Sequence, residues 1–257
     1  MLAALTQMLP ADVSIMTLVF ARVGAMVMTL PALGEATIPA QARLMLALGL
    51  TIVMAPLVGH LYPSVLSQSV LALAGIVISE VIIGLAIGLM IRMVLASVHV
   101  AGHLIATQTG LAFSQTFDAS QGAQSALLSM FLSMLAVVLI FASELHHQLI
   151  IGIEHSFELF PPGKLPPTAD FMKLSIEIVS GLFVTGMQMA APFIVFGLIL
   201  YGASGVVSRM MPQLQIFFIS MPISILGGFV ILGLSLSTMM LWFLDDFGTR
   251  LQPFVPH

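Results

Sequence analysis

Three charged residues stand inside long apolar runs, where only packing or transport chemistry would require them. They are Arg22, Glu80 and Arg92. An ionised side chain in such a run costs at least ~2.5 kcal/mol on membrane-insertion scales. The three residues indicate either a proton or ion pathway, or ion pairs between helices and subunits. We favour ion pairing, because three charges do not make a relay.

Histidines and one serine offer other candidate chemistry. His99 and His103 share a helix face at i, i+4 spacing, which can hold a metal. No HExxH occurs and no carboxylate lies near this pair in sequence, so we predict no metal site. Residues 202–205 read Gly-Ala-Ser-Gly, similar to the serine motif of rhomboid proteases. Ser204 would need a histidine on a later helix, and only His257 follows it, so we predict neither an enzyme nor a cofactor.

The amino-acid composition indicates whether water or lipid surrounds this chain. Of 257 residues, 59% are hydrophobic and 7% are charged, and the mean hydropathy is +1.13. Soluble domains carry about 25% charged residues. A bilayer solvates such a surface, so we predict an integral membrane protein in contact with lipid. The net charge of −4 without a basic run argues against a nucleic-acid partner, and the lack of cysteine excludes disulfides.

Six apolar stretches are long enough to approach or exceed a bilayer crossing. They cover residues 13–33, 42–59, 69–97, 122–153, 174–207 and 216–244. Unpaired backbone groups are too costly in lipid, so all six are predicted helices. The third, fourth and fifth are longer than a crossing needs, and we expect them to tilt, project or bend at Gly or Pro. The prediction is an all-α membrane protein forming a single domain over residues 1–257. The first ten residues lack Lys and Arg, so no cleaved signal peptide is expected.

Residues 108–122 form an unusual connection, QTGLAFSQTFDASQG. It is rich in small and polar residues, yet it contains Leu111, Phe113 and Phe117. Such a segment fits burial in protein or the lining of a pore, where non-helical backbone is tolerated. Small residues four apart also predict close helix packing. They are Gly84 and Gly88, Ser204 and Ser208, and Ser220, Ser224 and Gly228.

Several motifs follow one another along nearly the whole chain. In order they are Arg22, Pro31, Ile38-Pro39 and Arg43; Glu80, Gly84 and Gly88; Gln108-Thr109-Gly110 and Phe117-Asp118; His146 or His147, Ser156-Phe157 and Pro161-Pro162-Gly163; and Arg209, Pro212-Gln213 and Phe217. In this order they resemble the FliR/SctT family of type III export-gate subunits.

The resemblance implies a non-enzymatic subunit of a helical, hetero-oligomeric gate in the bacterial inner membrane, at the flagellar basal body or in an injectisome. We favour the flagellar system. FliP- and FliQ-type subunits would share a channel for unfolded proteins, and an FlhB-type subunit would wrap its cytoplasmic entrance. The loop at 108–122 would plug that channel, through Gly110, Leu111, Phe113, Phe117 and Asp118. Assembly and packing would involve Arg22, Pro39, Arg43, Glu80, Gly84, Gly88, Arg209, Pro212, Gln213 and Phe217.

A different class of function stays open on the residues alone. In a small-molecule or ion transporter, Arg22, Glu80 and Arg92 would form a site at the middle of the bilayer. Transporters often contain paired halves, and this sequence shows no convincing internal repeat. A stable complex with other subunits would favour the gate, and solute transport by a purified monomer would favour the transporter.

Overall fold

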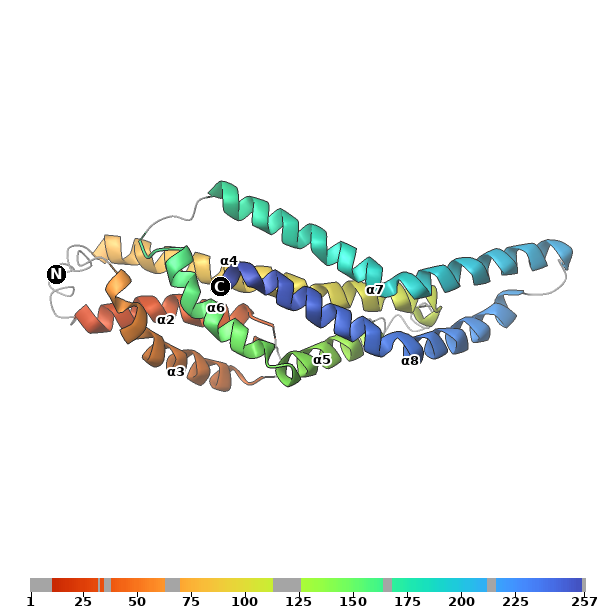
Figure 1. Ribbon diagram of the computed structural model, residues 1–257, viewed down its shortest axis with the longest axis horizontal. Coiled ribbons are helices and arrows are strands. Elements are labelled where there is room, and N and C mark those ends of the chain that lie inside the picture. The colour runs from red at the N-terminus through yellow and green to blue at the C-terminus, as the bar shows by residue number, and fades with distance from the viewer. Residues whose placement is uncertain are drawn as a thin grey trace. The chain divides into compact units, whose positions relative to one another are not determined.

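The computed structural model describes residues 11–31, 33–34, 38–62, 70–112, 126–163, 168–211 and 216–255, and all its regular elements are helices (Figure 1). These are α2 (Ala11–Thr29), α3 (Ala40–Val58), η1 (Gly59–Leu61), α4 (Val70–Gln108), α5 (Ala126–Ala142), α6 (Leu145–Leu159), α7 (Thr168–Met210), α8 (Ile216–Leu251) and η5 (Gln252–Phe254). The predicted all-α membrane fold is confirmed.

The helices match the six predicted apolar stretches. Within the described residues, four helical spans are long and apolar enough to cross a membrane: Ala40–Leu61, Leu73–Gln108, Met172–Met210 and Phe218–Phe254. The pair Leu127–Ala142 and Leu145–Leu159 makes a fifth if it is counted as one broken span. The first stretch forms a shorter apolar helix, Val13–Thr29.

The fourth stretch is bent where the sequence has no obvious breaker. Helices α5 and α6 meet at 77°, and Glu144 between them adopts a left-handed conformation with φ of 61°. Left-handed backbone strains most side chains, and it is usually left to glycine. The predicted bending of this long stretch is confirmed, but a glutamate and not a Gly or Pro makes the turn. Pro192 in α7 and Pro222 in α8 lie inside continuous helices.

The chain divides into two compact units. The first comprises Met1–Val94, Ile140–Ile178 and Gly248–His257, and the second comprises Leu95–Leu139 and Val179–Phe247. In the first unit, α2 packs against α3 and α4 (Figure 1). The inward side chains of α2 are fully buried. They include Leu18, Val19, Val23, Met26 and Val27.

In the second unit, small residues bring helices into contact. A Cβ at Gly102 of α4 would lie 2.6 Å from Ser129 Cα of α5, and one at Gly186 of α7 would lie 2.8 Å from Val100 Cγ1 of α4. These separations are too short for any real side chain, so both crossings depend on glycine. Van der Waals packing of this kind drives helix association in lipid.

Replacing Gly102 by alanine should lower the thermal unfolding midpoint by roughly 2–8 °C, because the added methyl meets backbone of α5 and such overpacking costs about 1–3 kcal/mol. The matched control is Gly75→Ala, also in α4, where a Cβ meets nothing within 4 Å. That change should be neutral or stabilising, because alanine favours helix. Equal midpoints for the two variants in detergent would contradict this packing.

Candidate functional site

The buried charges of the first unit form one ion pair. Arg22 of α2 and Glu80 of α4 both have fully buried side chains, and Arg22 Nε donates to Glu80 Oε2 at 2.5 Å. The two residues are 58 positions apart in sequence. A pair enclosed this completely is stable only when its remaining donors are also satisfied.

The rest of the guanidinium holds the end of α6. Arg22 Nη1 donates to the carbonyl of Ser156 at 2.8 Å, and Nη2 donates to the carbonyl of Phe160 at 2.9 Å. The Ser156 carbonyl also accepts the backbone N–H of Phe160 at 3.0 Å. Carbonyls at a helix C-terminus carry partial negative charge, so a cation stabilises them. The Phe157 ring centre lies 4.3 Å from Arg22 Cζ, which adds a cation–π contact. One side chain therefore joins α2, α4 and α6.

Glycines let α2 approach α4 closely enough to form the pair. A Cβ at Gly84 would lie 2.5 Å from the carbonyl oxygen of Arg22 itself, and one at Gly88 would overlap the Thr29 hydroxyl. Both glycines are buried. The predicted packing role of Gly84 and Gly88 thus has a direct physical basis: larger residues would move the backbone that carries Arg22.

One neighbour of this cluster is not indicated by the sequence, and Arg92 lies apart from it. Tyr62, directly after η1, is 7% exposed, and its ring lies 6.5 Å from that of Phe157. A lone tyrosine after a helix gives no sequence signal for this place. Arg92, in contrast, is exposed on α4, so the three charges do not converge on one site.

The other predicted assembly residues are more dispersed. Pro39 is the residue that precedes α3, and its carbonyl accepts the backbone N–H of Arg43 at 3.2 Å. Arg43 is half-buried, and Arg209 is exposed in the last turn of α7. Pro212 and Gln213 lie outside the described residues. Phe217 is on α8, in a part of the helix whose backbone alone is described.

The start of the predicted plug is held by α7 and α8. The carbonyl of Gln108, the last residue of α4, accepts the Ser224 hydroxyl at 3.3 Å and the Tyr201 hydroxyl at 3.5 Å. Thr109 is 2% exposed, and it occupies the space that a Cβ on Gly228 would need. Gly228 therefore has the packing role that its spacing predicts.

Gly110 follows Thr109 directly after α4. It is buried and has a φ of 76°. Leu111 is half-buried. The left-handed backbone explains the glycine, since other residues are strained there. Phe113, Phe117 and Asp118 lie outside the described residues, so the plug beyond Leu111 stays a prediction.

No catalytic or metal arrangement emerges from the described part of the chain. It contains no group of three or more His, Cys, Asp or Glu side chains that could hold a metal. His99 and His103 are exposed on α4, and His155 Nδ1 lies 3.1 Å from Glu158 Oε2. Ser204 donates its hydroxyl to the carbonyl of Leu200 at 2.8 Å, which is a helix-internal bond and not an activated nucleophile.

These features define a class: an all-helical membrane protein whose buried charges organise packing. A family model described as bacterial export proteins, family 1, matches residues 13–249. The flagellar biosynthetic protein FliR of Caulobacter vibrioides is 42% identical over 246 residues, which cover 95% of this chain and 96% of the relative. FliR of Escherichia coli K12 is 31% identical over 207 residues (80% and 78%), and FliR of Bacillus subtilis is 29% identical over 218 residues (84% and 83%).

This chain belongs to that bacterial export family, as a member of its FliR group. The resemblance carried by its ordered sequence motifs is thereby confirmed. It is a membrane-embedded component of an export apparatus.

Replacing Arg22 by alanine should destabilise the protein by about 3–5 kcal/mol, because the buried Glu80 carboxylate would lose its charged partner. The carbonyls of Ser156 and Phe160 would each lose one hydrogen-bond donor as well. Arg92→Ala is the matched control, and as an exposed change it should shift stability by no more than about 0.5 kcal/mol. Thermal unfolding of both variants in detergent measures this. Equal destabilisation by the two changes would refute the organising role of Arg22.

Proposed function

We propose that this chain is a non-enzymatic subunit of the flagellar type III protein export gate in the inner membrane. With FliP- and FliQ-type subunits it forms a channel through which unfolded flagellar components pass, and an FlhB-type subunit covers the cytoplasmic entrance. Membership of the FliR group and the flagellar biosynthetic role in the names of its relatives support this proposal.

The observation that carries the proposal is the apolar length of α7 and α8. Residues 179–208 and 216–244 contain no charged side chain. At 1.5 Å per residue they extend about 45 and 43 Å, against a hydrocarbon core of about 30 Å. Even a tilt of ~40°, at the upper end of those observed, leaves such helices longer than the core.

Apolar side chains are exposed near the C-terminus of α7 and in the N-terminal part of α8. Val206 and Met210 on α7 are 61% and 77% exposed, and Phe218 and Leu226 on α8 are 69% and 68% exposed. Lipid tails do not cover the whole of so long a surface, and water would not tolerate it. Apolar helices of neighbouring subunits supply the missing cover, so these helices suit a hetero-oligomer better than a lone transporter.

A polar face on α4 supports the channel. His99, His103 and Thr107 follow one another at four-residue spacing, and all three are exposed. Polar side chains at membrane depth normally face a bundle interior or a water-filled cavity. This face leads directly to Gly110, where the proposed plug begins. Apolar side chains of that loop close the channel by packing and dewetting.

The plug is tested in the assembled complex. Deleting residues 110–122 should increase ion conductance in planar bilayers. A length-preserving variant with serine at Leu111, Phe113 and Phe117 should also leak, because it removes the apolar seal while keeping the connection. Conductance equal to that of the unchanged complex in both variants would refute the plug assignment.

The C-terminal motif is tested by assembly. The double change Arg209→Ala and Gln213→Ala should lower the recovery of the multi-subunit complex several-fold. The reason is that the exposed guanidinium of Arg209 would bind a neighbouring subunit. Lys173→Ala is the matched control, since it removes an exposed cation from the same helix. Co-purification with FliP- and FliQ-type subunits gives the yield. Normal recovery of the double variant would count against an assembly role.

A further inference from the structure

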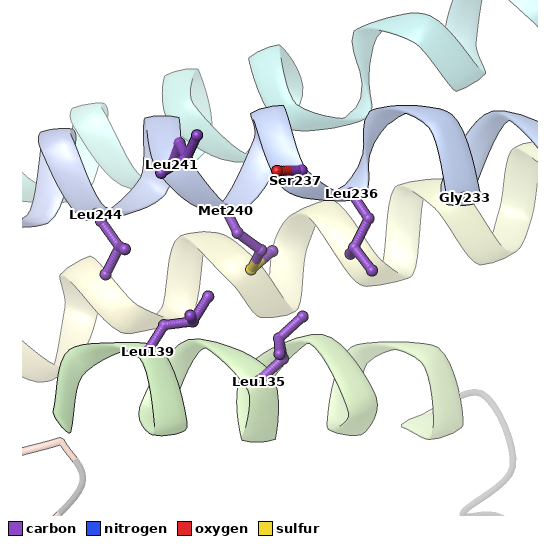
Figure 2. A pocket seen from close by; sticks show the side chains of 8 residues that line it. All are labelled: Leu135, Leu139, Gly233, Leu236, Ser237, Met240, Leu241 and Leu244. Atoms are coloured by element: carbon purple, nitrogen blue, oxygen red, sulfur yellow. The ribbon is translucent and has the colours of Figure 1, made fainter. Parts of the chain in front are cut away.

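A narrow apolar groove runs between α5 and α8 in the second unit (Figure 2). Its volume is about 350 Å³. Leu135 and Leu139 line it from α5, and Gly233, Ser237, Met240 and Leu244 are among the residues that line it from α8. Leu135 and Leu139 point from α5 toward the α8 side chains, and Ser237 is the one polar side chain in the lining.

The groove is open along one side. Met240 is 3% exposed, whereas Gly233 and Ser237 are exposed and Leu241 is 66% exposed. The lining positions on α8 recur every three or four residues, so they form one stripe of the helix. Gly233 and Ser237 carry the smallest side chains of that stripe, and their size leaves the hollow unfilled.

The dimensions of the groove suit one lipid chain. From Gly233 to Leu244 it follows α8 for 11 residues, or about 16 Å. One leaflet of a ~30 Å hydrocarbon core is about 15 Å deep, which is the reach of a single acyl chain.

Charge appears where a headgroup would lie. Asp245 and Asp246 are the first charged residues after the apolar run 216–244. Asp245 is exposed and lies four residues after Leu241, so it shares that face of α8. Asp246 is half-buried and accepts the Thr185 hydroxyl at 3.0 Å. Asp245 is therefore the carboxylate at the end of the groove.

We propose that this groove binds one acyl chain of a membrane phospholipid whose headgroup ammonium, as in phosphatidylethanolamine, pairs with Asp245. The apolar lining, the leaflet-length stripe and the terminal carboxylate each match one part of such a lipid. The bound chain would fill a hollow that the protein leaves between two of its own helices.

The test counts phospholipids retained by the full complex in mild detergent, using native mass spectrometry. A Cβ at Gly233 meets nothing within 4 Å, so Gly233→Leu fits the fold while its side chain fills the groove. This variant should retain one phospholipid fewer per copy of the chain. Gly202→Leu on α7 is the control, because its Cβ also meets open space, and it should retain the full number. Equal retention by Gly233→Leu and the unchanged complex would overturn the proposal.

A second measurement leaves the groove intact. A photocrosslinking side chain placed at Ser237 should yield an adduct with the mass of a phospholipid, and capture of a partner subunit instead would overturn the proposal. For the headgroup, Asp245→Asn should reduce the preference for phosphatidylethanolamine over phosphatidylglycerol about two- to five-fold, the range of an exposed ion pair. An unchanged preference would overturn the pairing with Asp245.

Discussion

The first unit depends on one buried guanidinium. Arg22 pairs with Glu80 and donates to two carbonyls at the end of α6, with all of its side chain out of solvent. Burying a charge costs several kcal/mol unless it is paired and hydrogen-bonded, and here α4 and the C-terminal end of α6 supply the contacts. Arginine suits this role better than lysine, because its planar fork serves several fixed acceptors at once.

Close approach of backbones is the second condition for this pair. Gly84 and Gly88 let α4 reach the backbone of α2 that carries Arg22. The second unit uses the same device at Gly102 and Gly186. Lipid provides no hydrophobic drive between apolar helices, so close packing and satisfied polar groups must supply the association energy. In lipid, a glycine therefore stabilises the fold by letting the neighbouring helix approach closely.

Helices α7 and α8 hydrogen-bond to the end of α4, and they also expose many apolar side chains. Near Gln108, hydroxyls from α7 and α8 hold the end of α4 and set the point where the proposed plug begins. Other side chains of these two helices, such as Leu198 and Leu234, are 76% and 80% exposed. The proposed gate would use both properties: the fixed turn would position the plug, and the exposed apolar side chains would contact neighbouring subunits.

Apolar length and charge were sufficient to predict the helices and the membrane class. The turn at Glu144 was not predictable, because no glycine or proline marks it and its left-handed backbone depends on tertiary packing. The sequence also indicated Arg22 and Glu80 as residues that take part in ion pairing and helix packing. It could not reveal their partners, since the carbonyls of Ser156 and Phe160 are backbone atoms that every residue shares. Arg92 has the same apolar sequence setting as Arg22 but is exposed, because sequence does not show which face of α4 is covered.

The central claim is that this chain works as a subunit of a hetero-oligomeric export gate. The most direct test is the mass and composition of the complex purified with a tagged copy of the chain from membranes of its own cells in mild detergent. The account predicts one complex that contains FliP- and FliQ-type subunits together with this chain. A monodisperse monomer that transports a small solute would contradict it.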